Sequence, residues 1–272
     1  MCWLRVFFHK MTMLDCYIIN LDRSKDRWDA NSERFRSLGF NVIRVPAIEG
    51  KDLTFPHPDF AAWRYFFWYG RPMVPNAVAC TFSHLKSLRT FLATDKEHAM
   101  VCEDDVFPPP EFTGVLKEAM QYSGSWDFLR LNGRKPTKGF DFATLSHGFH
   151  LRCDLKTAAG TGAYIVNRYA AETILKKCLP LRLPTDVMLF RDWSIGIREV
   201  TIHPFPIKIN EVNSKNSVIG KEPRYPLFHP ASLRHMISLP YRICSRTARM
   251  ISRIRLALRY RFDPPVPLEK EE

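Results

Sequence analysis

Three consecutive carboxylates, Glu103, Asp104 and Asp105, follow a short apolar run and are the residues of this chain best suited to chemistry. The run covers residues 99–102, and three prolines follow at 108–110, a pattern that indicates a buried strand ending at a loop. Adjacent carboxylates repel one another and resist desolvation unless a cation lies among them. A hard divalent metal prefers such oxygens and keeps positions open for phosphate. The alternative is an acidic turn whose aspartate caps the next helix.

The elements that must position these carboxylates begin in a β-α-β order. Residues 16–21 are rich in β-branched and aromatic types, which predicts a strand. A helix follows to about Leu38 and stops at Gly39, and residues 41–45 form a second predicted strand that ends at Pro46. This spacing predicts a parallel sheet with crossover helices. Such sheets bind ligands at the carboxyl ends of their strands, so residues 20–23 and 103–105 are expected to share one crevice.

The remaining elements continue this α/β pattern. A helix is expected over about 77–94, before the acidic strand, and an aromatic-rich segment at 52–76 is interpreted as an inserted lobe over the sheet. Further strands are predicted at 126–132, 160–166 and 199–203, with a helix over 168–177. The chain contains no internal repeat.

Composition and targeting features favour a globular protein in a reducing compartment. Seven scattered cysteines without a C-x-x-C pair argue against both a disulfide framework and a zinc site. No apolar stretch reaches the ~18 residues of a membrane-spanning helix. Charged residues interrupt the apolar N-terminal segment, 1–10, so that it does not form a secretory signal. We therefore expect a cytoplasmic protein.

A strongly basic segment closes the chain. Residues 224–262 hold nine arginines and no Lys, Asp or Glu, and so account for most of the net charge of +12. A helix is predicted from Pro240 to about Tyr260. One stripe of this helix carries Arg242, Arg246, Arg249 and Arg253, and the adjacent arc carries Ile243, Met250, Ile251, Ile254 and Leu258.

This arrangement predicts docking on the anionic inner face of the cell membrane through residues 240–261. A helix packed on the rest of the protein is the alternative. Nucleic acid is not expected as a partner, because no nucleic-acid motif or aromatic stacking platform accompanies the arginines.

Several short blocks, in their order and spacing, resemble the bacterial members of glycosyltransferase family 25, the lipooligosaccharide galactosyltransferase group. The blocks are YIINLDR (17–23), DR (26–27), AIEG (47–50), ACTFSH (79–84), VCEDDV (101–106), WD (126–127), GTGAY (160–164) and PTD (184–186). The resemblance covers roughly residues 15–210. Ala79 stands where the family usually has Gly, and Cys102 stands where it usually has an aliphatic residue.

The resemblance implies a GT-A-like, Rossmann-type mixed sheet flanked by helices. Residues 1–222 would form the catalytic domain. Residues 223–272 lie outside the resemblance and are expected, from their own arginines and apolar residues, to form a basic amphipathic helical tail at the membrane interface. The implied activity is inverting, metal-dependent transfer of a sugar, most often galactose from UDP-galactose, to a hydroxyl of a lipooligosaccharide, LPS or other surface glycan. A metal held by the acidic triplet, Mn²⁺ or Mg²⁺, would neutralise the departing diphosphate. The alternatives are a glycan- or nucleic-acid-binding protein without catalysis on the same fold, and a metal-dependent phosphohydrolase.

The hypothesis assigns roles to particular residues. Asp105 is the expected metal ligand, and Glu103 is a second ligand or a ribose partner. Donor contacts are expected from Asn20, Asp22, Arg23, Arg27, Ser83, His84, Glu103 and Asp104. Arg23 and Arg27 lie at a helix start that suits phosphate or uridine, although a solvated ion-pair turn is an alternative. The Ser83 and His84 roles come from the family pattern.

Inverting transfer also needs a base, and Asp186 is the residue proposed for this role. Helix capping is its alternative role, and Asp192 is the rival base.

Overall fold

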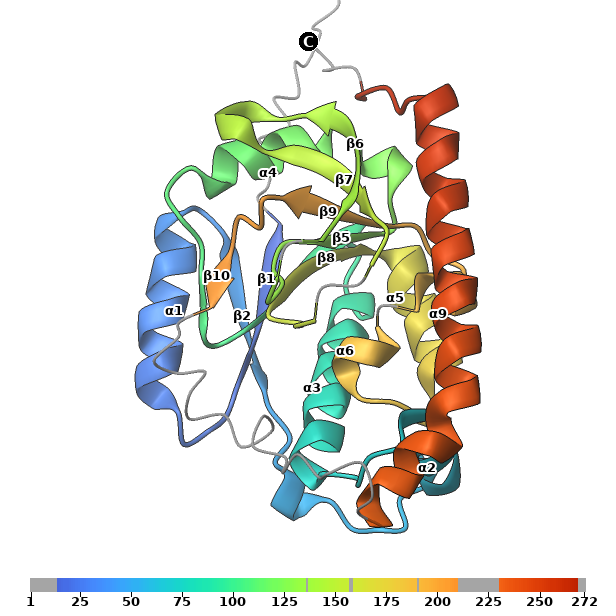
Figure 1. Ribbon diagram of the computed structural model, residues 1–272. Helices are drawn as coiled ribbons and strands as arrows, with labels where there is room; N and C mark the ends of the chain where they lie inside the picture. Colours follow the sequence, from blue (N-terminus) through green and yellow to red (C-terminus); the bar gives the residue numbers. More distant parts are fainter. Residues whose placement is uncertain (1–13, 136, 157–158, 190, 210–229, 269–272) are drawn as a thin grey trace, which may run out of the picture.

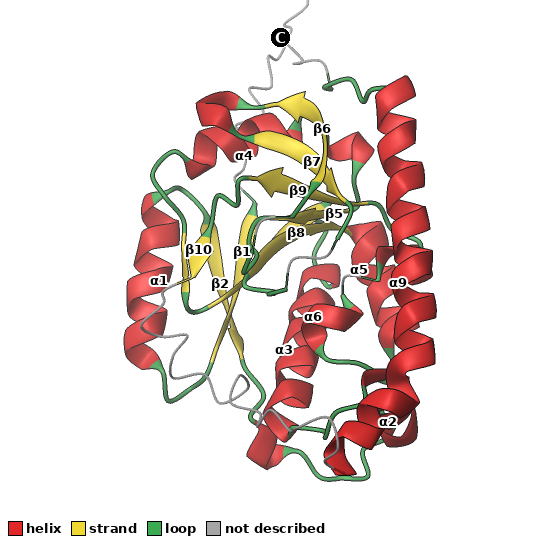
Figure 2. Ribbon diagram, viewed as in Figure 1, coloured by secondary structure: helices red, strands yellow, loops and turns green. Residues whose placement is uncertain are grey.

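The computed structural model describes residues 14–135, 137–156, 159–189, 191–209 and 230–268. The N-terminal segment considered as a signal lies outside these residues. Within the described parts, one mixed sheet has eight strands in the order β2-β1-β3-β8-β5-β9-β7-β6 (Figures 1 and 2). The strands in that order are β2 (Asn41–Pro46), β1 (Asp15–Asn20), β3 (His98–Glu103), β8 (Ala163–Asn167), β5 (Phe128–Arg130), β9 (Glu199–His203), β7 (His150–Asp154) and β6 (Gly139–Thr144).

Most of the main sheet runs in one direction. β1 is parallel to both β2 and β3, whereas β8 is antiparallel to its neighbours β3 and β5. β9 is again parallel to β5, and β7 is antiparallel to β9. The carboxyl ends of β1, β3 and β5 therefore meet at the same edge as the start of β8. The predicted mixed α/β fold is confirmed.

Helices cover both faces of this sheet. They are α1 (Lys25–Ser37), α2 (Ala62–Tyr69), α3 (Pro75–Leu92), α4 (Phe112–Met120), α5 (Arg168–Cys178), α6 (Thr185–Met188), α7 (Asp192–Ile195) and α9 (Pro230–Phe262). Side chains alternate between the faces of a strand. In β3, Ala99 and Val101 join the core on the side of α3 and α5, whereas Met100 and Cys102 join the core on the side of α1 and α4. The same alternation sets the direction of Glu103, the last residue of β3, and separates it from Asp104, which follows.

Two parts of the fold differ from the sequence-based prediction. Residues 139–154 form the antiparallel pair β6 and β7, for which no strand was predicted. A separate two-stranded sheet pairs β4 (Val106–Phe107) with β10 (Lys208–Ile209).

The aromatic-rich segment at residues 52–76 contains α2, and α2 packs against α9. Trp68 of α2 stacks on Tyr241 of α9, with 4.5 Å between the ring centroids. The segment therefore joins the C-terminal helix rather than only covering the sheet.

The C-terminal helix α9 begins ten residues earlier than predicted, and Pro240 lies inside it. It runs along one side of the molecule, past α5 and α2 (Figure 1). The predicted arginine stripe divides: Arg246 is exposed, whereas Arg253 is buried at 1% exposure. Arg253 Nε lies 2.8 Å from Asp192 Oδ2, and its Nη2 donates to Glu199. Arg253 thus attaches the helix to the sheet domain and does not face a membrane.

The predicted apolar arc of α9 faces outward. Its members are all 41–53% exposed: Ile243, Met250, Ile251, Ile254 and Leu258. No helix in the described parts of the chain has an apolar stretch long enough to cross a bilayer.

Candidate active site

The carboxyl edge of the sheet brings together polar residues from three strands. Asn20 ends β1, and its Nδ2 donates to Asp104 Oδ2 at 2.8 Å and to the Ser24 carbonyl at 2.9 Å. Asn20 Oδ1 accepts from Arg44 of β2. Asn20 is 1% exposed, so it holds the β3–β4 turn against the start of α1. Residues 20–23 and 103–105 thus meet through the Asn20–Asp104 hydrogen bond, but no residue of 20–23 lines the pocket beside Asp104.

Glu103 points to the α3 face of the sheet, as the alternation along β3 requires. Its Oε1 accepts from Thr161 Oγ1 at 2.8 Å, and His84 Nε2 lies 3.5 Å away. Burial raises the pKa of Glu103, but the His84 imidazole, the Thr161 hydroxyl and the Arg134 charge outweigh this and leave the pKa below its usual value. Glu103 is therefore ionised at neutral pH.

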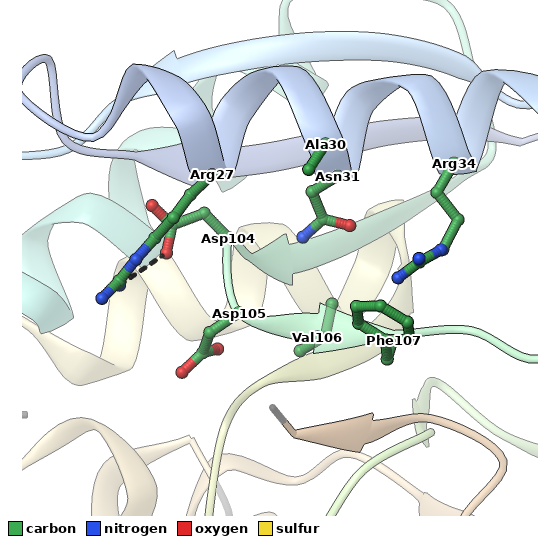
Figure 3. A pocket seen from close by; sticks show the side chains of 8 residues that line it. All are labelled: Arg27, Ala30, Asn31, Arg34, Asp104, Asp105, Val106 and Phe107. Atoms are coloured by element: carbon green, nitrogen blue, oxygen red, sulfur yellow. Dashed lines mark ion pairs between the residues drawn. The ribbon is translucent and has the colours of Figure 1, made fainter. Parts of the chain in front are cut away.

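Asp104 points to the opposite face, toward α1. Arg27 Nη1 lies 3.6 Å from Asp104 Oδ1, and the two flank a small pocket of about 70 Å³ below α1 (Figure 3). Burial raises the pKa of Asp104, although the Asn20 amide and Arg27 oppose the rise. Arg27 therefore pairs with the acidic turn rather than with its own helix neighbours. The pocket suits an ion or a few waters and is too small for a nucleotide sugar, which needs several hundred Å³.

Asp105 has no protein cation within ion-pair distance among the described residues, and its Oδ1 is buried without a hydrogen-bond partner there. Burial, followed by the charges of Glu103 and Asp104, raises the pKa of Asp105 to about 7. Figure 3 shows its carboxylate directed away from α1, on the other side of the turn from Asp104. Asp105 is half-buried, and a buried oxygen without a partner, beside the charges of Glu103 and Asp104, fits a divalent cation. The three carboxylates of residues 103–105 do not themselves converge, because among the described residues the group of three such ligand atoms within 4.8 Å of one another is Cys80, His84 and Glu103. Asp105 and Glu103 could hold a divalent cation, with phosphate oxygens and water completing the coordination.

Three predicted donor residues have other partners in this structure. Arg44 Nη2 donates to Asp22 at 2.7 Å, and the Asp22 side chain is 76% exposed. Arg23 forms an ion pair with Glu49. Asp22 and Arg23 thus form solvated ion pairs with residues outside their own turn. Ser83 is buried; its Oγ donates to the Ala79 carbonyl and accepts from the Ile48 amide. Ser83 therefore holds the segment after β2 against α3. Its hydroxyl, which was expected to bind the donor, is already used in these two hydrogen bonds.

Asp186 lies in the first turn of α6, but the N-cap residue of that helix is Pro184. Its alternative role as a helix cap is thus absent. Burial raises the pKa of Asp186, while Arg134 and Arg130 oppose the rise and Glu103 adds to it. The rival base Asp192 is 3% exposed and paired with Arg253. Asp192 serves the attachment of α9 and is not accessible to a substrate.

Three residues at this edge received no role from the sequence. The Thr161 hydroxyl bonds Glu103, and the Tyr164 hydroxyl lies 3.1 Å from His84 Nδ1. Arg134 is an exposed cation in the loop after β5 and lowers the pKa of both Glu103 and Asp186. Thr161 and Tyr164 belong to the block 160–164 of the family resemblance, which leads into β8, so the sequence marked their segment although it gave them no role. Nothing in the local sequence marks Arg134, because its importance depends on the return of α6 to the same edge.

A larger groove adjoins the acidic turn. Its volume is about 660 Å³, and Phe107 of β4 lines both this groove and the small pocket. Its other lining residues are mainly prolines, aromatics and two charged side chains: Pro108, Pro109, Glu111, Phe149, Pro204, Phe205, Pro206, Lys208 and Ile209. This volume lies in the range of ordinary ligand sites.

Comparison with known proteins identifies the class. The sequence profile of glycosyltransferase family 25 (LPS biosynthesis protein) matches residues 13–189, so the chain belongs to this family. A glycosyltransferase 25 family member of Anopheles gambiae is 30% identical over 135 residues, 46% of this chain and 22% of the relative. Procollagen galactosyltransferase 2 of mouse is 28% identical over 119 residues, 41% of this chain and 19% of the relative.

This chain thus spans about a fifth of the length of the curated relatives it matches. These relatives are animal proteins and give no support for the predicted bacterial origin.

Proposed function

We propose that this protein is a metal-dependent, inverting glycosyltransferase that moves galactose from UDP-galactose to a hydroxyl of a glycan acceptor. Family membership supports the reaction class, and the name of the mouse relative supports galactose. The observation that carries the metal is Asp105, a half-buried carboxylate whose buried Oδ1 has no partner among the described residues and whose pKa is raised to about 7. A cation that brings diphosphate oxygens with it would satisfy this carboxylate.

The chemistry requires a base and a stabilised leaving group. Asp186 accepts the proton of the acceptor hydroxyl, whose oxygen bonds the anomeric carbon while the bond from that carbon to the UDP oxygen breaks. Its raised pKa makes Asp186 a stronger base than an exposed aspartate. Arg134 supplies positive charge beside the diphosphate. A divalent metal held by Asp105 and Glu103 would neutralise the charge that develops on UDP.

An acceptor of the lipopolysaccharide type agrees with the family description and with the surface of α9. Along the helix at 100° per residue, Arg246 borders one side of the exposed apolar arc, and Arg255 and Arg259 border the other. All three arginines are exposed. This arrangement suits a membrane interface, with apolar side chains in the acyl boundary and cations on anionic headgroups. We propose that α9 holds the enzyme against an anionic membrane beside a lipid-linked acceptor.

A transfer assay tests the catalytic proposal. Purified protein is incubated with UDP-galactose and a lipopolysaccharide-derived acceptor, with Mn²⁺ or with chelator, and UDP release is measured. We expect metal-dependent release that Asp105→Asn abolishes while the far-UV circular dichroism stays unchanged. Normal turnover by Asp105→Asn would reject the metal assignment. Metal-dependent binding of UDP-galactose without any turnover would instead favour a binding protein on this fold.

Sedimentation with vesicles tests the membrane proposal separately. Replacing Arg255 and Arg259 with Gln should weaken binding to vesicles of phosphatidylserine by about 1 kcal/mol per arginine at low salt. Arg89→Gln, an exposed arginine of α3, is the matched control and should bind as the wild type does. Replacing Ile251 with Ser should also weaken binding. Equal binding by all variants, insensitive to salt, would contradict the proposed role of α9.

A further inference from the structure

A second cluster of metal-ligand atoms lies behind the acidic turn, on the α3 side of the sheet. One ligand atom each from Cys80, His84 and Glu103 all lie within 4.8 Å of one another. Cys80 and His84 are four residues apart on α3, so one helix face presents both. Glu103 ends β3 beside that face. Within the described residues, this group brings the ligand atoms of three His, Cys, Asp or Glu side chains this close together.

His84 is oriented as a ligand would be. Its ring is fully buried, and Nδ1 lies 3.1 Å from the Tyr164 hydroxyl. Within the described part of the chain, Nε2 is buried without a hydrogen-bond partner, 3.5 Å from Glu103 Oε1. Without an ion, an Nε2 proton would face the Glu103 carboxylate, in keeping with the lowered pKa of Glu103. With an ion bound, the proton would lie on Nδ1 and be donated to Tyr164, and Nε2 would offer its lone pair to the ion. A cation between Nε2 and the Glu103 oxygen would satisfy both of them. Metal-bound histidines usually have such a partner on the second ring nitrogen.

Two of the three residues of the cluster are partly exposed to solvent. Cys80 is partly exposed and the Glu103 side chain is 32% exposed, whereas His84 is closed off behind them. An ion could therefore enter past Cys80 and Glu103. The donor set of one sulfur, one nitrogen and one oxygen suits a borderline-soft ion such as Zn²⁺, and it differs from the all-oxygen set that Mg²⁺ prefers.

We infer that Cys80, His84 and Glu103 form a binding site for Zn²⁺ or a similar borderline-soft ion, distinct in its donors from the proposed Mn²⁺ site at Asp105. Three protein ligands leave a fourth position open to water. The two sites share Glu103, so an ion at the cysteine site withdraws that carboxylate from the donor metal. The resulting inhibition of sugar transfer rests on the proposed function, whereas the binding itself does not.

Cobalt substitution provides the direct test, because Co²⁺ bound to a thiolate gives an intense near-ultraviolet charge-transfer band. Full-length protein is titrated with Co²⁺ and then with Zn²⁺ in competition with a chromogenic chelator. We expect one equivalent bound, with the thiolate band, and displacement of Co²⁺ by Zn²⁺. Cys80→Ser should lose the band. Cys244→Ser, which removes an exposed free thiol on α9, is the matched control and should keep the band.

Tyr164→Phe leaves all three ligands in place and removes only the partner of His84 Nδ1. It should weaken Zn²⁺ binding by about 10- to 100-fold. A wild-type titration without a thiolate band would overturn the inference, whatever the variants do, and so would an unchanged band in Cys80→Ser. If the protein transfers sugar, Zn²⁺ should inhibit the wild type in Mn²⁺ buffer and not inhibit Cys80→Ser. Zinc binding without any transferase activity would refute the proposed function alone.

Discussion

The substitution Asp105→Asn tests whether the acidic turn is electrostatically strained without a cation. The pKa of Asp105 rises from 3.8 to about 7 through burial and the charges of Glu103 and Asp104. Between these two pH values, the folded protein holds a proton that the unfolded chain has lost. The folded state therefore loses stability as the pH rises from about 4 to about 7, and the full loss remains at higher pH.

The size of this loss sets the expected effect. At 1.36 kcal/mol for each unit of pKa, the rise corresponds to about 4 kcal/mol. The neighbouring carboxylates share the repulsion, and the Asn amide must itself be desolvated, so we expect Asp105→Asn to gain about 2 kcal/mol at pH 8. For a chain of this length, that gain raises the melting temperature by roughly 4–8 °C. The gain should vanish near pH 4.

Thermal unfolding in chelator at pH 8 and pH 4, followed by circular dichroism, measures this difference. Asp127→Asn is a control of opposite sign. Burial alone would raise the pKa of Asp127, but hydrogen bonds and charge from Arg198 outweigh it and hold the pKa below the usual value. Asp127→Asn should therefore destabilise the protein at pH 8. Mn²⁺ with UDP should stabilise the wild type and not Asp105→Asn. A lower melting temperature of Asp105→Asn at pH 8 would refute the reasoning.

Three further substitutions test the attachment of α9, the proposed base Asp186 and the contact between Thr161 and Glu103. Arg253→Ala should lower the free energy of unfolding in denaturant by about 3–5 kcal/mol, because it leaves the buried carboxylates of Asp192 and Glu199 without this partner. The control Arg255→Ala removes an exposed arginine and should change that free energy by less than about 0.5 kcal/mol. Asp186→Asn should lower kcat by about 100-fold or more with little change in the KM for UDP-galactose, as expected for a lost base. Thr161→Val should raise the pKa of Glu103 and shift the acidic limb of the pH–rate profile upward, because that carboxylate loses a hydrogen bond.

The sequence predicted the first half of the fold well, because that half consists of local patterns. Apolar runs with helix-length spacing identified β1, α1, β2, α3 and β3, each with boundaries within about two residues of those observed. Residues 139–154 were not predicted, since neither the exposed strand β6 nor its partner β7 has a continuous apolar run. Pairing with β9 stabilises β7, and this contact between distant segments leaves no local signal.

The orientation of α9 could not be predicted, for a different reason. Periodicity divided the helix correctly into a stripe containing Arg249 and Arg253 and an adjacent apolar arc. The usual expectation is that the apolar face packs inward. Here Asp192 and Glu199 lie buried on the sheet domain and require a cation. Arg253 therefore packs inward, Arg249 is half-buried, and the apolar arc remains exposed. A basic helix alone is therefore weak evidence for an anionic partner; the exposed arc with its flanking arginines carries the membrane proposal.

The acidic triplet shows how the period of a strand can separate neighbouring residues of similar chemistry. Glu103 continues the inward pattern of β3 on one face and is satisfied there by Thr161. Asp104 turns to the other face and is satisfied by Asn20 and Arg27. Only Asp105 remains without such a partner in the described structure, with its pKa near neutrality. The contacts of the other two carboxylates hold the turn in place, and they leave Asp105 to be neutralised by a proton below about pH 7 or by a bound cation.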